Sequence, residues 1–146
     1  MNYPGWIIAP DDIRAKLLRS TVSYIHYISN NHYENISLNL QFAYELNWRL
    51  EKCLMPIYVD VALYFENIID GHKAKQKGNL QIDSNEESEI SIRIQLQLSL
   101  LRCYREDGEL EKWKILQTEL QGDLEYYNEE QIEFFKYEVS LFYFLP

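Results

Sequence analysis

Histidines and cysteines are the side chains here best suited to metal binding or nucleophilic catalysis. His26 and His32 are six residues apart with Glu34 close by, and the three would surround a metal if the end of a helix folded back. No HExxH motif accompanies them, and a histidine beside Tyr24 and Tyr27 is more typical of a packed or surface ring. We therefore predict no metal site.

The two cysteines, Cys53 and Cys103, lie fifty residues apart in helical patterns and form no CxxC motif. This spacing predicts buried thiols rather than a disulfide framework or a zinc site. A cysteine nucleophile needs a base and an oxyanion donor nearby, and a thiol on an apolar helix face is usually inert. The glycines are isolated, so no phosphate-binding loop is present, and the carboxylates are too many for one pair to stand out. We predict no catalytic residue and no cofactor.

Four aromatic residues are the candidates for contact with a partner. Trp6 lies in an apolar arm near the N-terminus, and Trp48 lies off the apolar stripe of its predicted helix. Tyr126 and Tyr127 are flanked by acidic residues, a loop suited to gripping a basic peptide. Tryptophan and tyrosine are enriched at binding hot spots. The alternatives are packing of Trp48 against a second helix, and a solvated turn for the two tyrosines.

The elements that would hold these residues are predicted to be helices. At 146 residues, with 47% apolar and 25% charged residues, the chain has the composition of one globular domain. Only five glycines and four prolines leave few tight turns, which favours helices over a many-stranded sandwich. We predict an all-α fold, a single domain over residues 1–146 with about six helices in antiparallel hairpins. A polar loop over residues 72–85 would separate two helical halves. Predicted helix starts lie near Asp11, Ser37, Pro56, Ser84, Glu109 and Asn128.

The segment EISIRIQLQLSLL, residues 89–101, has apolar residues at every second position, the pattern of a half-buried strand. A strand partner is available in residues 79–83. The helix interpretation rests on Ser84 and Glu87, which fit a capping box, and on a run of helix formers that continues to Asp107-Gly108. On a helix, the alternation gives two apolar faces separated by polar residues such as Arg93 and Gln97. We favour a helix with neighbours on both sides.

Residues 98–121, LSLLRCYREDGELEKWKILQTELQ, read as an apolar helix, an Asp-Gly turn and an amphipathic helix. This unit resembles the helical hairpin of tetratricopeptide-type repeats, with Tyr104 and Gly108 at matching positions. Trp113 stands where the family usually has alanine, and the family's period of about 34 residues is absent. The resemblance implies a divergent hairpin array, of the kind found in larger helical scaffolds and sensors such as bacterial defence proteins.

The net charge of −9 is unevenly distributed. Residues 1–73 hold 6 basic and 8 acidic side chains, a net charge of −2, whereas residues 74–146 hold 8 and 15, a net charge of −7. Such a field disfavours nucleic acid and favours a basic protein partner. Solvation of helix faces is the simpler alternative. No secretory signal or membrane-spanning stretch is visible, so we expect a cytoplasmic protein that does not enter membranes.

Three functions are compatible with these patterns. The leading hypothesis is a non-catalytic protein–protein interaction module, free-standing or part of a larger scaffold, which binds its partner in the groove between hairpins. An acidic immunity or antitoxin-type protein that neutralises a basic toxin is the second. The third is an enzyme whose site is assembled from scattered residues. The apolar end of the chain, residues 141–146, either packs back onto the core or is covered by another helix, and a homo-oligomer is compatible with the second arrangement.

Overall fold

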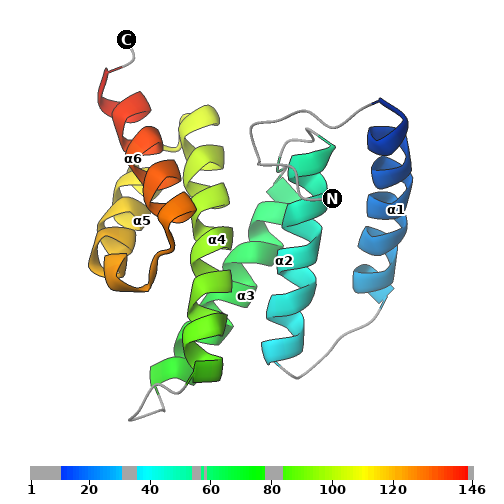
Figure 1. Ribbon diagram of the computed structural model, residues 1–146, viewed down its shortest axis with the longest axis horizontal. Helices are drawn as coiled ribbons and strands as arrows, with labels where there is room; N and C mark the ends of the chain where they lie inside the picture. The colour runs from blue at the N-terminus through cyan, green and yellow to red at the C-terminus, as the bar shows by residue number, and fades with distance from the viewer. Residues whose placement is uncertain (1–10, 31–35, 54–56, 58, 78–83, 145–146) are drawn as a thin grey trace.

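The computed structural model describes residues 11–30, 36–53, 57, 59–77 and 84–144. Every regular element in these ranges is helical, which confirms the predicted all-α fold of about six helices. None of the described helices is both long and apolar enough to cross a lipid bilayer. The elements, labelled in Figure 1, are α1 (Asp11–Asn30), α2 (Ile36–Lys52), α3 (Val59–Lys77), α4 (Ser84–Glu106), α5 (Leu110–Gly122), the 3-10 turn η1 (Leu124–Tyr126) and α6 (Glu129–Phe144).

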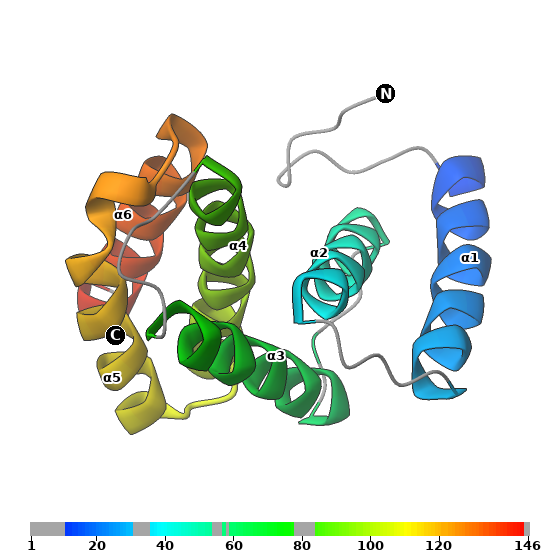
Figure 2. The same ribbon diagram turned by 90° about the horizontal axis from the view of Figure 1, so that it is seen from below.

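Helix α4 is the centre of the molecule. It packs against α2 and α3 on one side and against α5 and α6 on the other, while α1 packs against α2 at the far end. Figures 1 and 2 show this order, with α1 and α2 at one end of the molecule and α5 and α6 at the other. Successive helices alternate in direction (Figure 1). The segment with alternating apolar residues is therefore a helix between two layers, as predicted.

The alternation follows from this central position. Both apolar faces of α4 are buried, one of them through Ile90, Ile94 and Leu98 and the other through Leu96 and Leu100. A central helix has almost no solvent-facing side, so the polar residues between its two faces are buried as well. An unpaired buried polar group is costly, so the hydrogen-bond partners of these residues matter for the fold and for the site described below.

Gly108 forms the turn that connects α4 to α5. Its φ of 74° lies in the left-handed region that favours glycine. The amide of Glu109 donates to the carbonyl of Tyr104 at 2.8 Å, and the amide of Asp107 donates to that of Cys103 at 2.9 Å. These bonds satisfy carbonyls at the end of α4, and the short turn makes α5 antiparallel to α4.

The predicted capping box at the start of α6 is confirmed. The Gln131 amide donates to Asn128 Oδ1 at 2.8 Å, and the Asn128 amide donates to Gln131 Oε1 at 3.1 Å. The Gln131 side chain also donates through Nε2 to the carbonyl of Ser91 at 3.1 Å. The same residue therefore caps α6 and attaches it to α4.

The polar loop predicted over residues 72–85 is shorter in the structure. Helix α3 continues to Lys77 and α4 begins at Ser84, so only residues 78–83 remain, and these lie outside the described residues. The helix continues because its polar side chains have tertiary partners. Lys75 Nζ lies 2.8 Å from Ser37 Oγ and 3.5 Å from Glu89 Oε2. The composition of this stretch suggested a solvated loop, but the charged side chain of Lys75 forms contacts between helices.

The apolar end of α6 is divided between core and surface. Phe142 stacks on the buried Trp113 with ring centroids 3.7 Å apart and an interplanar angle of 6°. Tyr143 and Phe144 are 59% and 85% exposed. Tyr143 contacts Trp113 edge-on, with ring centroids 6.0 Å apart, so packing onto the core accounts for Phe142, in part for Tyr143 and not for Phe144.

Candidate functional site

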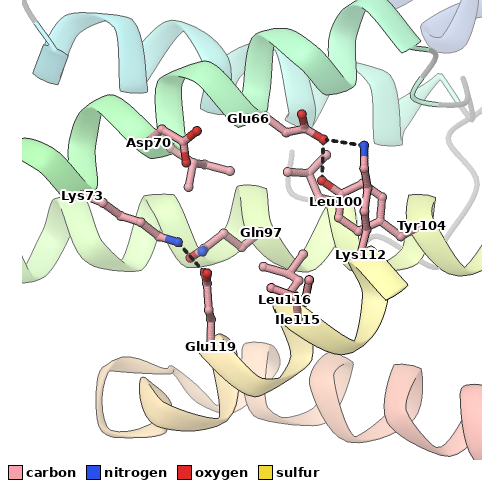
Figure 3. A pocket seen from close by; sticks show the side chains of 11 residues that line it. Glu66, Asp70, Lys73, Gln97, Leu100, Tyr104, Lys112, Ile115, Leu116 and Glu119 are labelled. Atoms are coloured by element: carbon pink, nitrogen blue, oxygen red, sulfur yellow. Dashed lines mark hydrogen bonds and ion pairs between the residues drawn. The ribbon is translucent and has the colours of Figure 1, made fainter. Parts of the chain in front are cut away.

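A pocket of about 240 Å³ opens between α3, α4 and α5 (Figure 3). Helix α4 forms its floor, and α3 and α5 form its two walls; we call it the groove. Its lining combines apolar and charged side chains from all three helices. The lining residues are Glu66, Ile69, Asp70, Lys73, Gln97, Leu100, Tyr104, Lys112, Ile115, Leu116 and Glu119.

Helical periodicity explains why the charged residues of each wall lie on one face of their helix. Glu66, Asp70 and Lys73 are spaced by four and three residues, so they share one face of α3. Lys112 and Glu119 are separated by two turns and share one face of α5. Because α4 packs against both helices, these two charged faces meet across its surface.

Two ion pairs cross the groove from wall to wall (Figure 3). At one end Lys73 pairs with Glu119, and at the other Lys112 Nζ lies 3.8 Å from Glu66 Oε1. Glu66 Oε1 also accepts a hydrogen bond of 2.6 Å from the hydroxyl of Tyr104. Burial raises the pKa of Tyr104, and the bond to Glu66 raises it further, so this hydroxyl remains a donor.

Gln97 is the exceptional residue of the groove. Its side chain is 1% exposed, yet neither Nε2 nor Oε1 has a hydrogen-bond partner among the described residues. A buried polar group without a partner costs about 1–3 kcal/mol. In Figure 3 its amide lies at the same end of the groove as the Lys73–Glu119 pair. The groove therefore has an unused donor and an unused acceptor at its floor.

Reactive groups are poorly placed for catalysis near the groove. Burial, together with the nearby carboxylate of Asp107, raises the pKa of Cys103 to about 12. The thiol lies 3.5 Å from Asp107 Oδ2 and 3.5 Å from the Ile57 carbonyl, so it is a protonated packing residue at neutral pH. Within the described ranges, no three metal-ligating side chains come together. The side chain of His26, and both His32 and Glu34, lie outside the described residues.

A buried polar network borders the groove between α3 and α4. Arg93 Nη1 donates to His72 Nδ1 at 3.3 Å, and His72 Nε2 then donates to Glu89 Oε2 at 3.3 Å. Arg93 also bonds Gln76 and lies 3.5 Å from Asp123 Oδ2, beyond the end of α5. Burial lowers the pKa of His72, and the adjacent guanidinium lowers it further. The network thus holds a neutral histidine and links three helices.

The three predicted contact residues that the structure describes do not form one surface. Trp48 is half-buried on α2, with Lys52 Nζ 5.7 Å from its ring centroid. Tyr126 is half-buried against the core in η1, which contacts α4. Tyr127 is buried, donates its hydroxyl to the Leu120 carbonyl at 3.0 Å, and so is a core residue rather than a contact residue. Trp6 lies outside the described residues.

A groove between hairpins was expected from the sequence, but the residues that line this one were not identified. The spacing of Glu66, Asp70 and Lys73 is a signal of a charged helix face that could have been used, and Gln97 was noted only as a polar residue between two apolar faces. Either signal alone is also typical of a solvated surface. Only the packing of three helices shows that these residues face one another.

Comparisons of the chain with protein-family models, with curated proteins and with solved structures found no match.

Proposed function

We propose that this chain is a non-catalytic protein-interaction module that binds a peptide segment of a partner protein in the groove between α3, α4 and α5. The pairing of α4 with α5 through Gly108 supports a divergent tetratricopeptide-type hairpin, in which such grooves bind peptides. We place the module in the cytoplasm, as a free-standing domain or as part of a larger helical scaffold.

The observation that carries this proposal is the unpartnered amide of Gln97 at the floor of the groove. Natural proteins leave few buried polar groups unsatisfied, and those that remain call for an explanation. A ligand that supplies the missing hydrogen bonds explains how a glutamine can be buried without a partner between Leu96 and Leu98.

Apolar surface at the rim supports a protein ligand. Ile115 lines the groove and is 64% exposed, and Leu100 and Leu116 lie below it. A peptide that covers Ile115 removes apolar area from water, which stabilises the complex by about 25 cal/mol per Å² buried. Small polar metabolites would gain little from this surface.

The charge of the groove supports a basic partner. The groove is lined by three acidic residues, Glu66, Asp70 and Glu119, and by two basic ones, Lys73 and Lys112. The chain as a whole carries a net charge of −9. Opposite charge accelerates association and favours basic segments over acidic ones. We therefore expect the association rate to fall as the salt concentration rises.

A peptide-display selection against the immobilised chain tests this function. Selected peptides are titrated by fluorescence polarisation against the wild type and against Ile115→Glu, which adds a charge to the rim of the groove. We expect the variant to weaken binding at least about tenfold, because it removes apolar contact and desolvates a charge.

Leu63→Glu is the matched control, because Leu63 is exposed on α3 but does not line the groove. It should leave the affinity unchanged, as should Trp48→Ala on α2. Failure to select any peptide, or equal loss of affinity in Ile115→Glu and Leu63→Glu, would overturn the proposed function.

A further inference from the structure

Resting on the proposed function, we propose that the groove selects peptides that carry a primary carboxamide, from glutamine or asparagine, next to a lysine or arginine. The carboxamide pairs with Gln97 at the floor, and the cation pairs with Asp70 at the rim. The Lys73–Glu119 ion pair opens to admit the side chain.

The chemistry of Gln97 selects the carboxamide. Its Nε2 is an unused donor and its Oε1 an unused acceptor, so a complementary group must present one acceptor and one donor side by side. A carboxylate would leave Oε1 unpaired, and an ammonium group would leave Nε2 unpaired. This requirement is the same whichever way round the amide of Gln97 is oriented, since both of its ends lack partners.

A side-chain amide meets the requirement better than the ligand's main chain. In a trans peptide unit the N–H and C=O groups point in opposite directions, so one unit cannot pair with both ends of Gln97. An extended residue does present its own N–H and C=O on one side, but the main chain that carries them would have to enter the buried floor, which a single side chain reaches from the rim. The NH₂ of glutamine or asparagine has a hydrogen on the same side as its carbonyl oxygen. Two hydrogen bonds can therefore form in one plane, and no charge has to be buried.

The ion pair above the floor explains how the site is closed without a ligand. The Gln97 amide has almost no exposure, while Lys73 and Glu119 come from opposite walls and meet across α4. The side chains of this pair are 32% and 43% exposed, and such pairs contribute little to stability. Breaking this ion pair therefore costs less free energy than a carboxamide gains from its two hydrogen bonds at the floor.

Asp70 supplies the charge preference. The carboxylates of Glu66 and Glu119 are engaged by Lys112 and Lys73, whereas none of the described lysines and arginines pairs with Asp70. Asp70 is exposed at the rim of the same pocket. A cationic side chain beside the carboxamide neutralises it, and an acidic side chain there is repelled.

Gln97→Met tests the carboxamide in the groove-binding peptides from the display selection. Methionine has a similar volume and no polar end, so the free variant keeps its fold, and its midpoint of denaturation stays the same or rises. We expect at least about a tenfold loss of affinity for peptides with glutamine or asparagine, and no further loss when that peptide residue is also methionine. Asp70→Asn should abolish the preference for lysine or arginine over alanine at the neighbouring position.

The outcomes separate the two proposals. Peptides that lose affinity in Ile115→Glu but bind Gln97→Met as tightly as the wild type would overturn the carboxamide inference and leave the groove as the binding site. A lowered midpoint of denaturation in Gln97→Met would also overturn it, because the amide would then have a partner in the free protein. Selection of no groove-binding peptide would overturn both.

Discussion

The two ends of the molecule are held in different ways. At one end α1 packs against α2, and Thr21 is the one buried side chain among those described in α1. The described contacts of α1 with α2 combine one ring pair with hydrogen bonds. Tyr24 packs edge-on against Phe42 with ring centroids 5.9 Å apart and donates to the Phe42 carbonyl at 3.2 Å, and Arg49 Nη1 donates to the Ser20 carbonyl at 3.0 Å. Each of these hydrogen bonds is worth about 0.5–1.5 kcal/mol.

At the other end, α4, α5 and α6 share a continuous apolar core reinforced by buried polar contacts. Trp113 and Leu120 of α5 and Phe135 of α6 are buried with the residues of α4. Arg105 of α4 donates to both oxygens of the buried Glu138 of α6, at 2.8 and 3.2 Å. Among the described side chains, those around α4 are far more deeply buried than those of α1, and we call α4, α5 and α6 with the helices packed on α4 the firm half. The groove lies in the firm half.

Leu96→Ala should have the largest effect on stability. Leu96 is completely buried in the centre of α4, so the substitution leaves a cavity and lowers the free energy of unfolding by about 3–5 kcal/mol. Leu18→Ala in α1 is the matched control: Leu18 is 43% exposed, and we expect a change within about 0.5 kcal/mol. Urea denaturation followed by circular dichroism measures both. Equal losses would mean that α1 is as tightly packed as α4.

Glu138→Ala should follow, with a loss of about 3 kcal/mol. The substitution leaves Arg105 without its bidentate partner, and we take the lower end of the range for broken buried pairs because Arg105 is 20% exposed. Glu133→Ala, at an exposed position of the same helix, controls for the change in helix propensity. If the two variants unfold at the same urea concentration, the pair does not hold α6 to α4.

The network around His72 predicts a pH dependence in the firm half. Burial lowers the pKa of His72 below its usual 6.5, so the unfolded chain binds the proton more readily than the folded one. The contribution of His72 to the free energy of unfolding is fully present above pH 6.5. It is lost as the pH falls through the pKa of the folded state, by at most about 1.4 kcal/mol per pH unit. The charged groups facing the ring are Arg93 and Glu89 of α4 and Lys75 of α3.

His72→Gln tests this origin. Glutamine offers a donor and an acceptor but does not titrate, so the slope of unfolding free energy between pH 6.5 and 5 should decrease relative to the wild type. Glu89 is expected to affect the pH dependence of the unfolding free energy only at lower pH. Burial alone would raise its pKa, but the hydrogen bond from Ser37 and the charge of Lys75 reverse the direction and lower it. An unchanged slope in His72→Gln would place the titrating group elsewhere.

The firm half was also the more predictable half. The turn at Gly108 and the capping box at Asn128 are local patterns with one structural solution, and both were confirmed. The alternating apolar residues of α4 were compatible with a strand or a helix, and the helix favoured by the long run of helix formers was confirmed. The end of α3 was not predictable in this way. Its polar residues 72–77 remain helical through contacts with α2 and α4, and local composition contains no information about such distant partners.

The candidate site was less predictable than the fold for the same reason. Tyr127 was chosen for its acidic neighbours, but its ring is buried and packs edge-on against Phe135 at 5.8 Å. Gln97 looked like a separator between two apolar faces. Its role depends on whether a neighbouring helix supplies a partner for the amide, and this follows from packing rather than from the sequence around it.

Tyr24→Phe should have the smallest effect on stability, and it tests the attachment of α1 to α2 most directly. The variant loses the hydroxyl that donates to the Phe42 carbonyl but keeps the ring, over which the Arg49 guanidinium lies at 4.7 Å. We expect a loss of about 0.5–1.5 kcal/mol that is confined to the attachment of α1. Native-state hydrogen exchange should show faster exchange of α1 amides and unchanged exchange in α4, because α1 opens without the rest of the core. Tyr44→Phe, at an exposed position of α2, is the control and should alter neither helix. If Tyr24→Phe accelerates exchange in α4 as much as in α1, the two ends unfold as one unit and the contrast between them is wrong.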